Sequence, residues 1–275
     1  MKKLFAVVLA VMMVLSLAAC GGAAQGEATQ APAATAAPAA ETTAAQAAAE
    51  VKTLEAGKLI MSTNASFPPY EMIADDGSFE GIDVEVADAI AKELGLELVV
   101  DDMDFDAALL AVQQGKSDIV MAGVTVTEDR KLVMDFSDTY ATGVQVVIVK
   151  EGSDVTLDNL GEKMIGTQRG TTGYIYTSDD YGEDHVTAYD NGASAVQALQ
   201  NGQVDCVVID SAPAHAYVEA NPGLTILDTE YVTEDYAIGL NKDNAPLLEA
   251  INGALKTLTE NGTIAAIVEK YIPTK

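Results

Sequence analysis

The chain has 275 residues and a formal net charge of −27, with 42 acidic side chains against 15 lysines and arginines. Such an excess of negative charge repels nucleic acid and anionic lipid head groups, so we expect no nucleic-acid ligand. Contact with a membrane would then come from a covalent lipid or a protein partner rather than from surface charge.

The first twenty residues have the layout of a secretory signal. Lys2 and Lys3 precede an apolar run over 4–17, which is too short to cross a bilayer comfortably. Residues 17–20 read Leu-Ala-Ala-Cys and resemble the bacterial lipobox, in which the cysteine receives a lipid and becomes the first mature residue. We therefore predict a lipoprotein signal peptide over 1–19 and lipidation of Cys20, which would anchor the protein to the outer face of the cell membrane.

The segment over 20–50 is dominated by Ala, Gly, Thr, Gln and Pro. This composition buries too little apolar surface to offset the entropy of ordering, so we predict a flexible tether. The residues from 51 onward are mixed apolar and charged, and are enough for one large or two modest domains. Cys206, the one cysteine beyond Cys20, stands in an apolar run and is expected to be a buried small hydrophobe without a disulfide.

Strand and helix patterns alternate after residue 58. The pattern predicts a strand at 58–63, a hairpin around 75–77, a helix at 84–94, a strand at 96–100, a helix at 105–114 and a strand at 118–121. Asp83 is expected to cap the first helix, and Gly95 to end it in a left-handed conformation. Alternation of this kind favours a mostly parallel sheet with helices on both faces.

A second unit of similar build follows, with a helix at 193–201 and a strand at 206–209. In both units a helix, a glycine and an aspartate lead into a strand, which suggests two lobes. The β-branched run over 143–149 and the segment over 236–240 are candidates for strands that cross between the lobes, before a last helix at 244–260.

We therefore predict an α/β fold of two lobes, each a mostly parallel sheet flanked by helices. Lobe 1 would hold 51–146 and 238–275, and lobe 2 would hold 147–237. Two connecting strands make a hinge, and a hinge between lobes makes a cleft that closes.

Ligands of open α/β sheets bind beyond the carboxyl ends of the strands, which directs attention to the loops there. After the strand at 118–121, Thr127 is suited to cap a short helix, which would aim Arg130 from a fixed point. A guanidinium held in this way favours a carboxylate, because its planar fork gives two parallel charge-assisted bonds. An ordinary surface salt bridge is the alternative in a chain with so many acids.

Asp210 directly follows the buried strand at 206–209, where a carboxylate without a cation would be costly. An amino group is its natural partner, so Arg130 and Asp210 together would recognise a zwitterion. The loop over 168–173 precedes a helix expected at Tyr174, and its N–H groups could hold the anionic end of that ligand. Phe67 and Phe105 could enclose the apolar part, although each alone is more often a core residue.

Several stretches together carry a family resemblance. They are Phe-Pro-Pro-Tyr-Glu at 67–71, Gly-Ile-Asp-Val-Glu-Val-Ala at 81–87, Thr-Val-Thr-Glu-Asp-Arg at 125–130 running on to Asp-Phe-Ser at 135–137, and Gly-Thr-Thr-Gly at 170–173. Over 58–272 the chain resembles the family 3 solute-binding proteins of ABC-type amino acid importers. The resemblance implies a type II periplasmic-binding-protein fold, a free amino acid as ligand and a transporter permease as partner. With it we expect a monomer without cofactor, metal or enzymatic activity.

The resemblance also implies roles for single residues. Arg130 would grip the α-carboxylate with Thr125 and the Thr172 backbone, the Gly123 backbone and Asp210 would receive the α-ammonium, and Phe67 and Phe105 would sandwich the ligand. Members that bind strongly basic amino acids carry aspartate at the position of Asn64, and Gln168 occupies a variable position that can face the ligand side chain. We therefore expect a polar ligand that is not strongly basic.

Two other functions use the same fold. A dehydratase of the cyclohexadienyl or arogenate type would need a dedicated acid and would have no use for Asp210 as an ammonium partner. His185 and His215 stand in no catalytic motif, and neither 179–184 nor 101–106 has the spacing of a calcium loop. A ligand sensor is the third possibility, and it would act through a separate signalling protein.

Overall fold

The computed structural model describes residues 51–228 and 230–273, which belong to one compact unit. The predicted signal peptide, Cys20 and the predicted tether lie outside the described residues. Among the helices of the described part, none is both long and apolar enough to cross a membrane.

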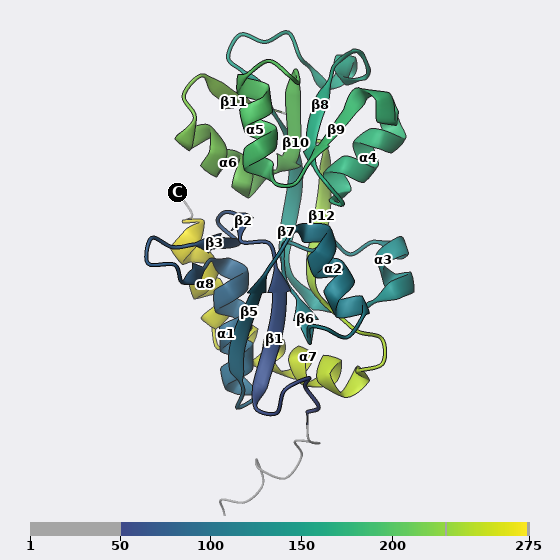
Figure 1. Ribbon diagram of the computed structural model, residues 1–275. Helices are drawn as coiled ribbons and strands as arrows, with labels where there is room; N and C mark the ends of the chain where they lie inside the picture. Colours follow the sequence, from purple (N-terminus) through teal and green to yellow (C-terminus); the bar gives the residue numbers. More distant parts are fainter. Residues whose placement is uncertain (1–50, 229, 274–275) are drawn as a thin grey trace, which may run out of the picture. The chain divides into compact units, whose positions relative to one another are not determined.

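A single large sheet runs through this unit (Figure 1). Its strands are β1 (Lys58–Thr63), β5 (Glu97–Asp102), β6 (Ile119–Val120), β7 (Asp135–Lys150), β8 (Ile165–Gln168), β9 (Val186–Tyr189), β10 (Cys206–Asp210), β11 (Leu224–Ile226) and β12 (Val232–Leu240). They lie in the order β5-β1-β6-β12-β7-β10-β8-β9, with β11 paired to β7. Pairing is parallel among β5, β1 and β6 and among β10, β8 and β9, whereas β7 and β12 run antiparallel to each other and to their neighbours.

The helices pack in two groups, one at each end of this sheet (Figure 1). They are α1 (Ile82–Glu93), α2 (Phe105–Gln113), α3 (Glu128–Val133), α4 (Thr172–Tyr181), α5 (Gly192–Gln200), α6 (Ser211–Ala220), α7 (Ala245–Glu260) and α8 (Thr263–Tyr271), with short 3₁₀ turns η1 (Leu157–Glu162) and η2 (Glu183–His185). A small sheet of β2 (Ser66–Phe67), β3 (Glu71–Ile73) and β4 (Phe79–Glu80) lies beside α1.

Figure 1 shows two lobes joined by β7 and β12, as the sequence predicts. The β1 lobe contains β1 to β6, α1, α2, α3, α7 and α8. The β10 lobe contains β8 to β11, η1, η2, α4, α5 and α6. Since β7 and β12 pass through both lobes, they are the crossing strands.

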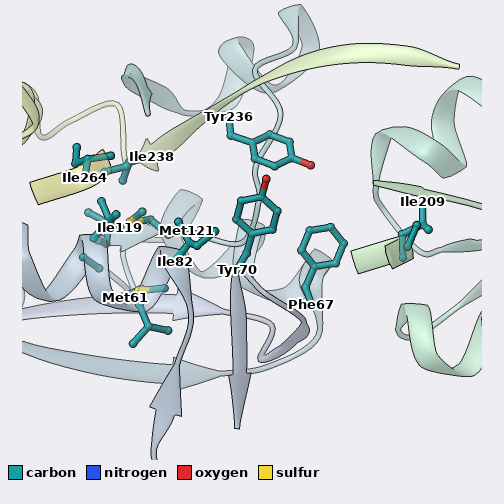
Figure 2. Close-up of a cluster of buried hydrophobic side chains, with 14 of the residues drawn as sticks. Met61, Phe67, Tyr70, Ile82, Ile119, Met121, Ile209, Tyr236, Ile238 and Ile264 are labelled. Carbon is teal, nitrogen blue, oxygen red and sulfur yellow. The ribbon is translucent and has the colours of Figure 1, made fainter. Parts of the chain in front are cut away.

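Apolar side chains of the β1 lobe form a core that extends to the crossing strands. Figure 2 shows Met61, Ile119 and Met121 packed in this core, and Tyr70 and Phe67 continuing it toward Tyr236 on β12 and Ile209 on β10. Phe67 stacks on Tyr70 at 5.8 Å between ring centroids, and Tyr70 meets Tyr236 edge-on at 5.4 Å. This aromatic row fixes one wall of the space between the lobes.

Most predicted elements are confirmed within a few residues, with β1 at its predicted bounds and Gly95 left-handed at φ 71°. The prediction that Asp83 caps α1 is wrong. Gly81 precedes the helix at φ 128°, where a Cβ would lie 2.2 Å from the Tyr70 carbonyl oxygen. Asp83 lies inside the first turn and is fully buried. Its carboxylate accepts from the Gly123 N–H and the Tyr140 hydroxyl, and these long-range partners turn it away from the helix end.

Other elements also differ from the prediction. The crossing strands β7 and β12 begin at Asp135 and Val232, before the predicted 143 and 236. The strand expected at 118–121 is the two-residue β6, and a helix not predicted from the sequence, α8, follows α7. The helix after the 168–173 loop begins at Thr172 rather than Tyr174, because the Thr171 hydroxyl accepts from the Tyr174 N–H and caps it.

Candidate functional site

The nine residues predicted to contact a ligand line one cavity between the lobes: Asn64, Phe67, Phe105, Gly123, Thr125, Arg130, Gln168, Thr172 and Asp210. They lie at or soon after the carboxyl ends of β1, β5, β6, β8 and β10, as expected for an open α/β sheet. The structure adds other lining residues that the sequence did not indicate, namely Glu71, Ala122, Gln145, Thr171, Ile209 and Tyr236.

Several contacts hold Arg130 in place in the lining of the cavity. The Thr127 hydroxyl accepts from the Arg130 N–H at 3.2 Å, which confirms the predicted cap of α3. The guanidinium donates to the carbonyl oxygens of Thr125 at 2.8 Å and Gly170 at 3.1 Å. It also lies 5.4 Å from the centroid of the Phe105 ring. These contacts fix the direction of a cation that is only 8 % exposed.

The charge of Arg130 has no carboxylate partner at ion-pair distance, since none of the ion pairs in the described residues includes it. The alternative of an ordinary surface salt bridge is therefore wrong. Burial lowers the pKa of Arg130, and the charge of Glu234 acts in the opposite direction. A guanidinium has more N–H donors than two carbonyl groups use, so it can still bind an anion from the cavity.

Asp210 lies at another part of the same cavity and is 1 % exposed. Its carboxylate accepts from the Tyr236 hydroxyl at 2.6 Å, the Val144 N–H at 3.0 Å and the Ala212 N–H at 3.1 Å, the last of which caps α6. These neutral donors, rather than a cation, satisfy the hydrogen-bonding capacity of the buried Asp210 carboxylate. Burial raises the pKa of Asp210 to about 6, so the carboxylate is ionised at neutral pH and suited to a cation.

Two more carboxyl groups lie near Gly123. Asp83 accepts from the Gly123 N–H at 2.9 Å, and burial raises its pKa to about 6. Glu71 lines the cavity, is fully buried, and interacts with the Asp83 carboxyl group. Burial and the charge of Asp83 raise the pKa of Glu71 well above its ordinary value, so Glu71 favours its protonated form.

Neutral amides form a bridge between the lobes across the cavity. The Gln168 side-chain N–H donates to the Asn64 side-chain oxygen at 3.0 Å, and the Asn64 amide donates to the Met103 carbonyl at 2.9 Å. Both amide side chains are almost fully buried. Near Arg130, the hydroxyls of Thr125 and Thr172 approach each other from opposite lobes at 3.5 Å.

The crossing strands contribute residues that sequence reasoning missed. The Gln145 amide donates to the buried Glu234 carboxylate at 2.9 Å, and its own oxygen is buried without a partner in the described residues. Gly143 leaves room for the site, because a Cβ there would lie 2.4 Å from Asp210 Oδ2 and 2.5 Å from the Tyr236 hydroxyl. A polar residue alone in the apolar run 143–149 was a signal for Gln145.

Comparison with protein families identifies this architecture. A model of the bacterial extracellular solute-binding proteins, family 3, matches residues 59–274. The chain belongs to that family. The resemblance found in its motifs is thereby confirmed, and the protein is an extracytoplasmic solute-binding protein rather than an enzyme.

Relatives with known names agree with this assignment. A probable histidine-binding protein of Neisseria gonorrhoeae is 34 % identical over 98 % of this chain and 96 % of its own length. ABC transporter arginine-binding protein 1 of Escherichia coli is 30 % identical over 79 % of this chain and 92 % of its own. An ancestral arginine-binding protein, solved with glutamine bound, has 40 % identity and a TM-score of 0.76 over 79 % of this chain and 99 % of that one. The type II periplasmic-binding-protein fold is thus confirmed.

The positions of metal-ligating side chains show whether the described part of the chain has a metal-binding site. Within residues 51–228 and 230–273, no group of His, Cys, Asp and Glu side chains is arranged to hold a metal ion. Cys206 is fully buried, and burial raises the pKa of its thiol to about 12, as fits a core residue.

Proposed function

We propose that this protein is the amino-acid-binding component of an ABC importer, and that its ligand has a polar side chain that is not strongly basic. One observation carries the proposal. The same cavity contains a buried guanidinium without a carboxylate partner and a buried carboxylate without a cationic partner, and an α-amino acid zwitterion complements both.

The geometry supports a specific division of roles. Arg130 would bind the α-carboxylate with help from Thr125 and the Thr172 backbone at the start of α4. Asp210 and the Gly123 carbonyl would receive the α-ammonium, and Phe67 and Phe105 would enclose the aliphatic part of the ligand. Each charge-assisted contact contributes about 1.5–3 kcal/mol to binding.

The amide bridge supports the polar side chain. Asn64 and Gln168 offer donors and acceptors but no charge that would compensate a cationic group. Arginine is the main alternative, because relatives and similar structures carry arginine-binding names and are up to 41 % identical to this chain. Glutamine, which one similar structure holds, fits the amide environment better.

Delivery to the transporter completes the proposal. Lobes at 51–146 with 238–275 and at 147–237 would close on the ligand, and the permease would recognise the closed form. A signal peptide over 1–19 would direct secretion and be removed, and a lipid on Cys20 with the tether over 20–50 would keep the mature protein at the membrane surface. A sensor role would use the same closure but would pass it to a signalling protein.

A thermal-shift screen of the purified mature protein tests this proposal, because a ligand that binds only the folded state raises the melting temperature. The screen should contain the twenty amino acids, cystine, ornithine and prephenate, with Arg130→Ala as the control. We expect the largest shift from a neutral polar amino acid and none in the control. A largest shift with arginine would overturn the side-chain preference alone. A response to prephenate with silence from every amino acid would overturn the function.

A further inference from the structure

Within the described residues, several direct hydrogen bonds join the two lobes. Those from Arg130 to Gly170, from Gln168 to Asn64 and between the hydroxyls of Thr125 and Thr172 are made by residues that line the cavity or its edge. Another involves no predicted ligand contact. The hydroxyl of Tyr217, on α6 of the β10 lobe, donates to the Ser66 carbonyl oxygen of β2 in the β1 lobe at 2.8 Å.

The β10 lobe holds the Tyr217 side chain in place. Tyr217 is 8 % exposed and lies against the start of α5, where Gly192 has no side chain. A Cβ on Gly192 would lie 2.9 Å from the Tyr217 ring, 3.0 Å from its hydroxyl and 2.6 Å from Ile209. Burial also raises the pKa of Tyr217, so the hydroxyl remains a hydrogen-bond donor across the physiological pH range.

The Ser66 carbonyl oxygen that accepts this hydrogen bond lies next to a cavity-lining residue of the β1 lobe. Ser66 directly precedes Phe67, which lines the cavity, and its own N–H donates to the Asn64 carbonyl at 2.6 Å. Both residues of β2 pair with β3, which fixes the direction of the Ser66 carbonyl. The Tyr217 bond therefore joins one lobe to the segment that carries Asn64 and Phe67.

We propose that Tyr217 is a closure latch, a positioning residue that holds the lobes together through the Ser66 carbonyl and so prolongs the residence of the bound ligand. This inference rests on the proposed function, since residence time has meaning only for a protein that captures a solute. The latch forms only when the lobes meet, so it stabilises the closed form of the protein. It should therefore slow dissociation and leave association nearly unchanged.

Tyr217→Phe removes the hydroxyl and keeps the ring. We expect the dissociation rate of the ligand identified in the screen, measured by stopped flow, to rise about 2- to 10-fold, with the association rate changed less than about 2-fold. Gly192→Ala, which displaces the Tyr217 ring, should also raise the dissociation rate. An unchanged dissociation rate in Tyr217→Phe would overturn the latch.

Two controls separate the latch from a structural role. Tyr231→Phe also removes a tyrosine hydroxyl, one that donates to Asp180 rather than across the cleft, and should leave the dissociation rate unchanged. Ser66→Ala keeps the main-chain carbonyl that accepts the bond and should behave like the natural protein. A loss of melting temperature in Tyr217→Phe beyond that of Tyr231→Phe, with both rate constants altered equally, would show a structural role and overturn the proposal.

A measurement without ligand distinguishes failure of the latch from failure of the proposed function. Lys92 of α1 and Asp158 of η1 are both exposed and can be replaced by spin-labelled cysteines, Lys92→Cys and Asp158→Cys. Pulsed electron resonance then reports the distance between the two lobes. In the ligand-free mature chain carrying Cys20→Ala, we expect Tyr217→Phe to reduce the population at the short, closed distance. An identical distance distribution in the two proteins would contradict the latch, whatever the ligand screen shows.

Discussion

The cavity wall carries two charged regions that are built in opposite ways. In one, a single cation, Arg130, is held by neutral carbonyl groups and an aromatic ring. In the other, the carboxylate of Asp210 is held by neutral N–H and hydroxyl donors. The charge of Arg130 does not change with pH in the physiological range, whereas Asp210 titrates near pH 6, so only the second contact to a ligand should depend on pH.

Removing the cation should have the largest effect. Arg130→Ala should weaken binding of the amino acid at least about 100-fold, because a bidentate, charge-assisted contact to the α-carboxylate is lost. Arg130→Lys, which keeps the charge without the planar fork, should recover only part of the affinity. Titration calorimetry measures both, and natural affinity in Arg130→Ala would mean that the carboxylate binds elsewhere.

Removing the charge of Asp210 should have the next largest effect. Asp210→Asn keeps the size of the side chain, and we expect about 10- to 100-fold weaker binding of the amino acid. An analogue of the ligand without its α-amino group makes the matched comparison. It should bind the natural protein and Asp210→Asn almost equally, and a large difference between the two proteins for this analogue would contradict the ammonium assignment.

A change of pH should affect affinity and stability in opposite directions, with the smallest effects. The bound ammonium favours ionised Asp210, so lowering the pH from 7 to 5 should weaken binding about 10-fold, as a pKa of about 6 implies. The affinity of Asp210→Asn should change less over this range. Calorimetry at the two pH values checks this, and equal loss in both proteins would assign the effect to other groups.

The stability of the ligand-free protein follows the reverse sign. The folded-state pKa values of Asp83 and Asp210, about 6, lie above the ordinary value, so the folded state binds more protons than the unfolded state at intermediate pH. Stability should therefore fall as the pH rises from about 4 to about 6, and these two groups should add no further change above that. The melting temperature should be higher at pH 5 than at pH 7, and Asp83→Asn should reduce the difference.

Much of the fold could be predicted because it rests on local patterns. The buried run at 58–63, the left-handed Gly95 and the Thr127 cap each depend on neighbouring residues, and each lies where the sequence indicates. Asp83 was misassigned because its partners, Gly123 and Tyr140, are distant in sequence. Local capping preference favours an aspartate at a helix start, but here long-range hydrogen bonds decide its place.

The residues of the site also fall into those that local sequence predicts and those that depend on long-range strand pairing. Arg130 and Asp210 could be placed in the cavity because Arg130 lies in the first turn of a capped helix within a family motif, and Asp210 ends a recognisable strand. Gln145 and Tyr236 could not be assigned to the cavity, because their positions follow from the register of β7 with β12 and β10. The partners of Asp210 were also hidden, since the Tyr236 hydroxyl and the Val144 N–H come from different strands.

The most direct test of the account is whether Arg130 and Asp210 bind the two charged groups of one amino acid. It requires a crystal structure of the mature protein with the amino acid that gives the largest thermal shift. We predict the α-carboxylate on the Arg130 guanidinium and the α-ammonium on the Asp210 carboxylate, with the side chain near Asn64 and Gln168. A ligand bound outside the cavity, or one whose ammonium does not contact Asp210, would contradict the assignment.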